Sequence, residues 1–217
     1  YCDMVSMARP FLADADLVRK AREGRADEIN TCIGCNQACL DHTFSGRITS
    51  CLVNPRACHE TELVIQPAPR RKRIAVVGAG PAGLGFAVTA AERGHAVTLY
   101  EAGAEIGGQF NIAKKVPGKE EFNETLRYFR RQIELRGIAL HVNTRATAEM
   151  LLQGEFDEVV IATGIVPRTP PIDGVGHPKT LGYLDVLRDD KADVYDVAIV
   201  GAGGIGFDVA EFLTDGG

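Results

Sequence analysis

Residues 73–101 carry the pattern that most constrains the fold of this chain. An apolar stretch at 73–77 runs into the turn GAGPAG, a helix-forming stretch follows, and a second apolar stretch at 96–100 ends at Glu101. A G-x-G-x-x-G turn between a strand and a helix, with an acidic residue about 20 positions further on, is typical of a βαβ unit that binds a dinucleotide. We therefore predict an α/β, Rossmann-like domain here.

Each residue of this unit has an expected role. Gly78 allows the tight turn, Gly80 lets the backbone approach a pyrophosphate, and Gly83 lets the helix pack against the strand. The helix N-terminus presents N–H groups to the phosphates, and Glu101 accepts hydrogen bonds from the adenosine ribose. The alternative is that the glycines serve only the turn. The expected dinucleotide contacts are Gly78, Gly80, Pro81, Ala82, Gly83, Glu101 and Ala102.

A second glycine turn lies near the C-terminal end. Residues 197–200 are apolar, and GAGGIG follows at 201–206. This pattern predicts the first βα unit of a second, NAD(P)-binding domain. A basic residue at the end of the second strand favours NADP and an acidic one favours NAD, but that position is not in this chain. The expected contacts are Gly201, Gly203, Gly204 and Gly206.

The segment at 27–64 carries a cysteine pattern and lacks clear periodicity. A long irregular segment in a compact protein needs something to organise it, and a metal centre can do so. Three crowded cysteines with a distant fourth are typical of iron–sulfur ligation, whereas structural zinc sites favour two pairs. We predict a [4Fe-4S] cluster, with zinc as the alternative. The expected ligands follow the spacing C-x2-C-x3-C-x11-C and are Cys32, Cys35, Cys39 and Cys51.

Residues 3–24 predict one strand, a tight turn and a helix. The apolar stretch at 3–8 supplies the strand, Asp14 is a suitable helix N-cap, and Gly24 is a stop signal. Arg9 directly follows the strand, where α/β folds place phosphate sites. Spacing alone nevertheless favours a surface salt bridge for Arg9.

Further elements follow the first βαβ unit. Apolar residues repeat at helical spacing between Phe122 and Ile133, which predicts an amphipathic helix within 119–136, and Gly137 is its stop signal. The other predicted elements are strands at 138–142 and 158–162, a Pro- and Gly-rich crossover at 167–178, and a short helix at 183–188.

Composition excludes several classes of protein. The chain has 217 residues and a formal net charge of −5, so we expect no nucleic-acid partner, and the basic run at 70–73 is expected to be a solvated linker. No apolar run reaches the ~20 residues of a membrane span, and we expect no signal peptide. Six cysteines near redox motifs predict a reducing, cytoplasmic setting. Residue 1 is not Met, and Gly217 falls within a supersecondary unit that has only begun, so we expect a piece of a longer protein.

The two remaining cysteines have no clear partner. Cys58 could replace Cys51 as the fourth metal ligand. We expect instead that Cys2 and Cys58 are both ordinary buried thiols.

Two further motifs indicate which dinucleotide binds at the first turn. A glycine pair occurs in EIGGQ at 105–109, and ATG at 162–164 ends a later apolar stretch. Together with the first turn they resemble two-dinucleotide flavoproteins of the glutathione reductase type. The resemblance implies FAD at the first turn and an NAD(P)H domain inserted within the FAD domain. It adds Gly108, Gln109, Ala162, Thr163 and Gly164 to the expected FAD contacts.

Longer stretches carry a more specific resemblance. CIGCNQACLD, CLVNPRACHE, VVGAGPAGL, EIGGQFNIAKKVPGKEEF and IATGIVPRTPPIDG are similar to bacterial NADPH-dependent 2,4-dienoyl-CoA reductases, in the group that includes trimethylamine dehydrogenase. The resemblance implies that residues 1–27 end an FMN-binding TIM barrel, 28–64 hold the cluster, 65–190 bind FAD and 191–217 begin an NADP-binding domain. It also places Arg9 at the FMN phosphate.

The implied activity is the reduction of 2,4-dienoyl-CoA in the β-oxidation of unsaturated fatty acids. Electrons would pass from NADPH to FAD, to [4Fe-4S], to FMN and to the substrate. The substrate pocket and proton donor would lie in earlier barrel strands, so we assign no catalytic residue and expect this piece alone to be inactive. A close alternative is an amine dehydrogenase, an enone reductase or an NADH-dependent reductase of the same group. An alternative of another class is a non-catalytic protein that binds zinc and nucleotide.

Overall fold

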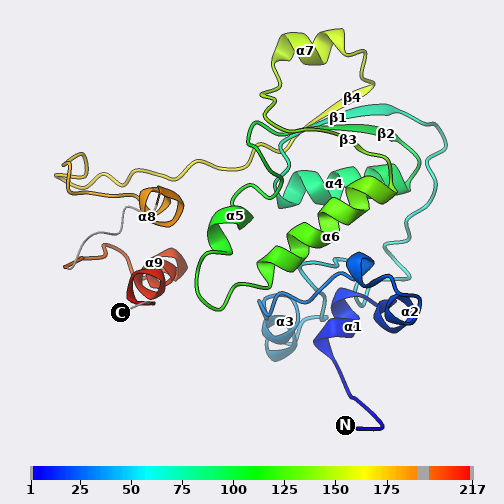
Figure 1. The fold of residues 1–217 in the computed structure, drawn as a ribbon, viewed down its shortest axis with the longest axis horizontal. Helices are drawn as coiled ribbons and strands as arrows, with labels where there is room; N and C mark the ends of the chain where they lie inside the picture. The colour runs from blue at the N-terminus through cyan, green and yellow to red at the C-terminus, as the bar shows by residue number, and fades with distance from the viewer. Residues whose placement is uncertain (1, 190–195, 216–217) are drawn as a thin grey trace.

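The computed structural model describes residues 2–189 and 196–215. In this part of the chain, four parallel strands form a sheet in the order β3-β2-β1-β4 (Figure 1). Chain order reverses beside β1, and ligands of open α/β sheets bind at the carboxyl ends of the strands at such a switch point. The strands, close to the predicted ones, are β1 Arg73–Val77, β2 Ala96–Tyr100, β3 Ala139–His141 and β4 Glu158–Ile161.

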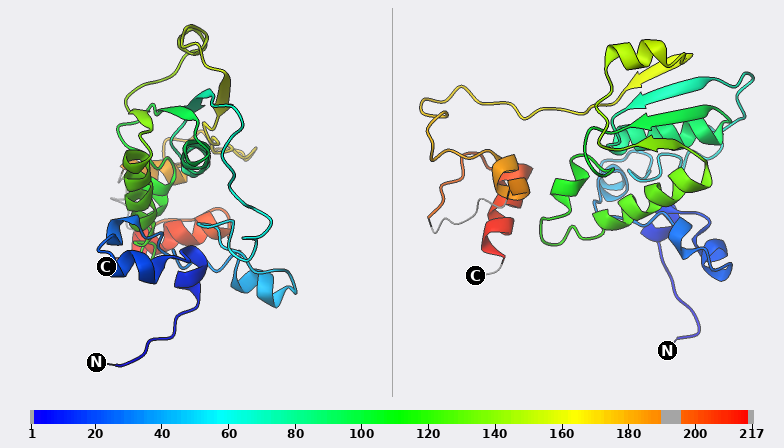
Figure 2. Two further views of the ribbon diagram at one scale, coloured as in Figure 1. Left: turned by 90° about the vertical axis from the view of Figure 1, so that its right-hand side faces the viewer. Right: turned by 45° about the horizontal axis from the view of Figure 1, so that its top comes forward.

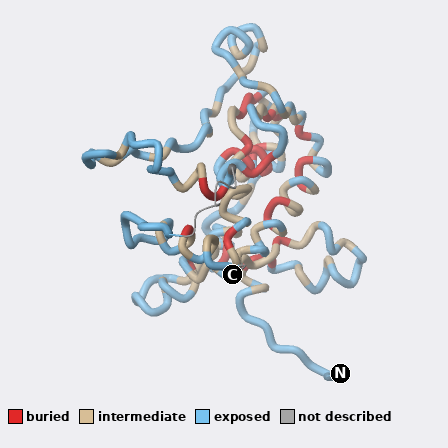
Figure 3. Tube along the Cα trace, turned by 60° about the vertical axis from the view of Figure 1, so that its left-hand side comes forward, coloured by how far each residue is buried: buried red, intermediate tan, exposed pale blue. Residues whose placement is uncertain are grey.

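The main core lies between the sheet and two helices. α4 Pro81–Glu92 and α6 Phe122–Leu135 lie side by side on one side of the sheet, and α7 Ala148–Gln153 lies on the other (Figures 1 and 2). Val76 and Leu99 are paired in the β1–β2 register and are both fully buried. Figure 3 shows burial concentrated in this region, while residues 2–9 at the N-terminal end are exposed.

Helix α6 confirms the amphipathic pattern predicted for 119–136. Leu126 and Ile133 are buried, and Gly137 adopts φ +61° just beyond the helix, a conformation that favours glycine. With 14 residues, α6 is the longest helix of the described part. No helix there has the length and apolar character needed to cross a membrane.

The N-terminal segment departs from the prediction. Residues 3–8 form no strand, because a strand needs the backbone hydrogen bonds of a neighbour and none of the described strands lies beside them. Helix α2 Leu17–Arg22 has Asp16 at its N-cap, so the prediction of Asp14 there is wrong. Gly24, at φ +71°, ends α2 as predicted.

Short helices interrupt an otherwise irregular N-terminal third. The segment at 27–64 is mostly irregular, as its lack of periodicity predicted. The helix before Asp14 and the small helix within the cysteine pattern had no clear sequence signal. Besides α2, the short elements of this third are α1 Arg9–Ala13, the 3-10 helix η1 Ala26–Glu28 and α3 Leu40–Phe44.

The C-terminal part forms a second, smaller cluster. Beyond β4 the chain crosses over without helix or strand through 167–178, as predicted, to α8 Tyr183–Asp189. α8 packs against α9 Gly204–Thr214 and α5 Phe110–Ala113. The buried residues of this cluster are Val116, Val186, Leu187 and Val209.

The strand predicted at 197–200 is not formed. These residues are exposed and have no neighbouring strand within the described residues, so their backbone lacks ladder partners. The predicted domain boundary between 190 and 191 lies outside the described residues.

The basic run at 70–73 is more than a solvated linker. It remains largely exposed, but Lys72 Nζ lies 2.6 Å from an oxygen of Glu158. The backbone N–H of Arg73 donates to Asp157 Oδ2 at 2.7 Å. The run is therefore tied to the acidic residues at the start of β4.

Candidate functional site

The first glycine turn is shaped by close backbone packing. Gly78 adopts φ +104°, and a Cβ built there would overlap the carbonyl oxygen of Ala162. A Cβ on Gly83 would overlap the carbonyl oxygen of Gly78. Both glycines are therefore required by the fold, as their expected roles in the turn and in helix packing demand.

Gly80 has a different reason to be glycine. It is the N-cap of α4 with φ −74°, which any residue can adopt, and a Cβ built there would meet nothing within 4 Å. Protein packing thus leaves the space in front of Gly80 open, at a helix N-terminus whose first N–H groups have no side-chain cap. An anionic group such as a pyrophosphate fits this position.

The acidic residue of the motif lies at the same turn. Glu101 Oε2 accepts a hydrogen bond from the backbone N–H of Ala79 at 2.8 Å, and Oε1 accepts one from Gly103 at 2.7 Å. A carboxylate has further acceptor capacity on both oxygens, so the side chain can still receive ribose hydroxyls. Ala102 follows it and is exposed.

Two more predicted segments converge on this edge of the sheet. Gly108 adopts φ +54°, and a Cβ on it would lie 3.2 Å from the Cα of Gly80. Gln109 Nε2 donates to the carbonyl oxygen of Ile165 at 3.1 Å, just beyond Thr163 and Gly164. Tyr183, which sequence reasoning missed, donates its hydroxyl to Gln109 Oε1 at 3.3 Å. The turn, the 105–109 loop and the end of β4 are thus brought together.

The second glycine turn repeats the backbone of the first. Gly201 adopts φ +118°, and a Cβ on Gly206 would overlap its carbonyl oxygen, the same relation as between Gly78 and Gly83. Gly203 is the N-cap of α9 with φ −89° and ψ 179°, close to the −74° and 179° of Gly80. Gly203 and Gly204 also face open space. Chain geometry therefore provides two turns of similar backbone shape, each with open space at a helix N-terminus.

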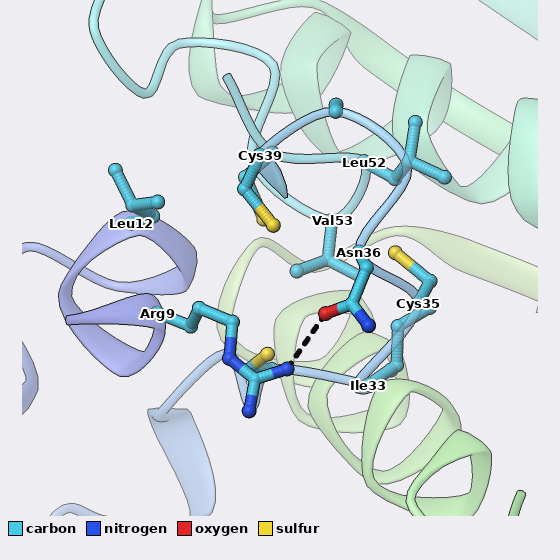
Figure 4. A pocket seen from close by; sticks show the side chains of 11 residues that line it. Arg9, Leu12, Ile33, Cys35, Asn36, Cys39, Leu52 and Val53 are labelled. Carbon is cyan, nitrogen blue, oxygen red and sulfur yellow. Dashed lines mark hydrogen bonds between the residues drawn. The ribbon is translucent and has the colours of Figure 1, made fainter. Parts of the chain in front are cut away.

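The four cysteines of the pattern line one pocket. Cys32, Cys35, Cys39 and Cys51 are all partly buried around it, and Figure 4 shows the side chains that line it. Burial raises the pKa of the Cys51 thiol above its usual 9.0, and the nearby Cys32 and Cys35 add to this effect. A bound cation would stabilise the thiolates that such burial disfavours. The remaining pocket residues are Arg9, Leu12, Ile33, Asn36, Ala38, Leu52 and Val53.

The two other cysteines lie apart from this pocket. Cys2 and Cys58 are exposed, so the prediction that both are buried thiols is wrong. The chain around them explains this, because each lies in irregular structure outside both apolar clusters. Cys58 is absent from the pocket lining, whereas Cys51 is part of it.

A single metal ion needs its ligands closely grouped. A tetrahedral zinc ion holds its sulfurs at about 2.3 Å, and hence about 3.8 Å from each other. Among the described residues, no three His, Cys, Asp or Glu side chains are grouped to hold a single metal ion. The cluster and its zinc alternative therefore both stay predictions for this pocket.

Side-chain hydrogen bonds hold the pocket together. Asn30 Nδ2 donates to the Val53 carbonyl oxygen at 2.7 Å, and Asn54 Nδ2 donates to the Leu12 carbonyl oxygen at 2.8 Å. These amides join the chain before the cysteines to the chain after them. Sequence reasoning gave neither Asn30 nor Asn54 a role at this site.

Buried Asp14 anchors the same frame. Its Oδ2 accepts from the backbone N–H of Asn30 at 2.9 Å and from Lys20 Nζ at 2.6 Å, and its Oδ1 accepts from Asp16 N–H at 3.0 Å. Only 6% of Asp14 is exposed. Asp14, which was expected at a helix N-cap, is therefore a buried acceptor that ties α2 to the start of the cysteine segment.

Arg9 lies at the pocket rather than in a surface salt bridge. Its Nη1 donates to Asn36 Oδ1 at 2.8 Å, and the two side chains point toward each other in Figure 4. Asn36 has φ +58° and lies between Cys35 and Cys39. A cationic side chain from α1 is thus held against the cysteine loop.

The fold and this arrangement define a dinucleotide-binding oxidoreductase domain with an attached cysteine pocket. Residues 72–217 match the pyridine nucleotide-disulphide oxidoreductase family, and the chain belongs to that family. The family domain implies binding of FAD and NAD(P)H.

Known relatives extend over nearly the whole chain. It is 41% identical over 219 residues to a metal reductase of Desulforamulus reducens, with 99% of this chain and 33% of that protein covered. It is 35% identical over 216 residues to a bilirubin reductase of Mediterraneibacter gnavus, covering 100% and 34%. A solved 2-naphthoyl-CoA reductase in complex with 2-naphthoyl-CoA matches with a TM-score of 0.89 and 37% identity, covering 97% and 32%. The chain spans about a third of the length of these relatives. They confirm the predicted flavoprotein oxidoreductase group.

Proposed function

We propose that this chain is the electron-delivering part of an NADPH-dependent flavoprotein that reduces a conjugated double bond of an acyl-CoA, with 2,4-dienoyl-CoA as substrate. One observation carries the proposal: two glycine turns of the same backbone geometry occur in one chain with a pocket lined by four cysteines. Two dinucleotide sites beside a metal centre serve electron transfer between cofactors and have no evident use in a purely structural protein.

The first turn is assigned to FAD. The open space at Gly80 and the N-terminus of α4 receive the pyrophosphate, while Glu101 receives the ribose. Gly108 and Gln109, which lie beside the turn, extend the site toward Thr163 and Gly164. The second turn is assigned to NADPH, whose pyrophosphate would lie at Gly203 and the N-terminus of α9.

The cysteine pocket is assigned to a [4Fe-4S] cluster held by Cys32, Cys35, Cys39 and Cys51. When bound, such a cluster supplies one-electron transfer between two flavins. Arg9 lines the same pocket. The family resemblance additionally implies that its guanidinium binds the FMN phosphate.

The substrate class rests on the relatives. The solved 2-naphthoyl-CoA reductase acts on an aromatic acyl-CoA, and a cinnamate reductase of Clostridium sporogenes is 33% identical over 216 residues. Both names denote reduction of conjugated carboxyl compounds. Dimethylamine and histamine dehydrogenases are also similar, so amine oxidation is the second candidate.

The full-length protein provides the test. We expect it to contain iron and acid-labile sulfide, and to oxidise NADPH faster than NADH with a 2,4-dienoyl-CoA as acceptor. Turnover of a simple enone but not of the dienoyl-CoA would overturn the assignment of 2,4-dienoyl-CoA as substrate. Reduction of an artificial acceptor by dimethylamine would support the amine candidate. Stoichiometric zinc without iron or sulfide would overturn the cluster and the relay.

A further inference from the structure

One side chain of the dinucleotide-binding domain grips the chain directly before the cysteines. Arg127, in the middle of α6, donates Nη1 to the carbonyl oxygen of Asp27 at 2.5 Å and Nη2 to that of Ile29 at 2.8 Å. Nη2 also lies 3.3 Å from Thr31 Oγ1, next to Cys32. A single guanidinium thus contacts Asp27, Ile29 and Thr31, which lie 96 to 100 residues away in sequence.

Neighbours on α6 orient the Arg127 guanidinium and support its contacts with the segment before the cysteines. Glu124, one turn earlier on α6, accepts from Arg127 Nε at 2.6 Å. Arg131, one turn later, forms an ion pair with the carboxylate of Asp27 at 2.8 Å. The Arg127 side chain is only 31% exposed. Charge-assisted bonds from an oriented, half-buried guanidinium are stronger and more directional than those of an exposed one.

The Arg127 contacts lie between the cysteine pocket and the proposed FAD turn. α6 packs against α4, and the N-terminus of α4 at Gly80 is the proposed FAD turn. The gripped segment leads directly into Cys32. Helix α6 therefore connects the two sites through packed, rigid elements rather than through the long irregular linker that joins them in sequence.

We propose that Arg127 is a positioning residue that fixes the distance between the cysteine pocket and the FAD turn, and so sets the rate of electron transfer between them. This inference rests on the proposed function. Because its partners are mainly backbone carbonyls, the contact positions the chain whatever side chains that segment carries. Lysine offers one point charge in place of the planar fork and cannot span the same carbonyls.

The experiment uses the full-length protein and the variants Arg127→Ala and Arg127→Lys. Arg130→Ala is the matched control, since Arg130 lies on the same helix and, among the described residues, is paired only with Glu105, at 3.2 Å. After rapid mixing with NADPH, reduction of FAD and of the cluster are followed separately by absorbance. Hydrogen exchange at residues 26–32 reports the grip itself, and redox titration reports the cluster potential.

In Arg127→Ala we expect unchanged iron content, cluster potential and FAD reduction, but cluster reduction slowed by about tenfold or more, because small displacements have large effects on position-sensitive steps. The rate of cluster reduction should be only partly restored in Arg127→Lys, and in Arg130→Ala it should equal that of the wild type. Exchange at 26–32 should rise in both Arg127 variants. Normal cluster reduction in Arg127→Ala would overturn the inference, as would an equal loss of FAD reduction, which indicates general destabilisation.

Failure of the proposed function would look different. Wild-type protein without iron would remove the electron-transfer role, whereas faster exchange at 26–32 in Arg127→Ala would still show the grip. Wild-type protein with a reducible cluster and no effect of Arg127→Ala would leave the proposed function standing and remove the inference alone.

Discussion

The side-chain amide of Asn30 lies 2.7 Å from the carbonyl oxygen of Val53 and donates a hydrogen bond to it. Asn30 comes just before Cys32, and Val53 comes just after Cys51. One contact therefore closes the loop that carries all four pocket cysteines. The pocket depends on such side-chain bonds because regular secondary structure is scarce in this segment.

Removal of this closure should loosen the pocket. We expect Asn30→Ala to lower the free energy of unfolding by about 1–2 kcal/mol, since a partly buried carbonyl loses its donor. In the full-length protein, iron should also pass to a chelator faster. Asn123→Ala, at an exposed position of α6, should change neither quantity. Equal chelation rates in the two variants would contradict a role for Asn30 in holding the pocket.

Loss of the buried Asp14 carboxylate should lower the free energy of unfolding by more than loss of the Asn30 amide. Asp14→Ala leaves the ammonium of Lys20, whose side chain is 16% exposed, without its carboxylate and also removes the acceptor for Asn30 N–H. We expect a loss of about 3 kcal/mol or more in chemical denaturation. Asp16→Ala breaks an exposed pair with Arg19 and replaces an N-cap whose side chain makes no capping hydrogen bond, so it should change stability by less than about 1 kcal/mol. Similar losses of stability in the two variants would argue against a structural role for buried Asp14.

Gly80 and Gly83 should respond differently to alanine. Gly83→Ala puts a Cβ onto the carbonyl oxygen of Gly78 and should destabilise the domain. Gly80→Ala meets no protein atom within 4 Å, so thermal stability of the FAD-free protein should hold while FAD affinity falls. Fluorescence titration with FAD and thermal unfolding separate the two effects. Wild-type FAD affinity in Gly80→Ala would place the pyrophosphate elsewhere.

Cysteine replacements should separate pocket residues from the rest. We expect Cys51→Ser to lose most of its iron and its visible absorbance, because Cys51 lines the pocket. Cys58→Ser should retain both, because Cys58 is exposed and outside the pocket. Iron and sulfide analysis of the purified full-length variants is the measurement. The reverse result would make Cys58 the fourth ligand.

Local patterns predicted most of the sheet and of the glycine turns. Strands such as Arg73–Val77 and the helix from Phe122 to Leu135 have strong periodicity, and the special conformations of Gly78 and Gly137 are restricted by backbone sterics. Strands at 3–8 and 197–200 were wrongly predicted because an apolar stretch becomes a strand only where a neighbour supplies hydrogen bonds.

Spacing predicted a dinucleotide turn and a metal centre, because turn geometry and metal chemistry restrict residue types over short distances. How the sites are joined depended on contacts between residues far apart in sequence, which leave no periodic trace. Asp14 beneath the cysteines, Asn30 across to Val53 and Arg127 over residues 26–31 became visible only in the folded chain. There, α6 contacts both η1, just before the cysteine segment, and α4, which follows the first glycine turn.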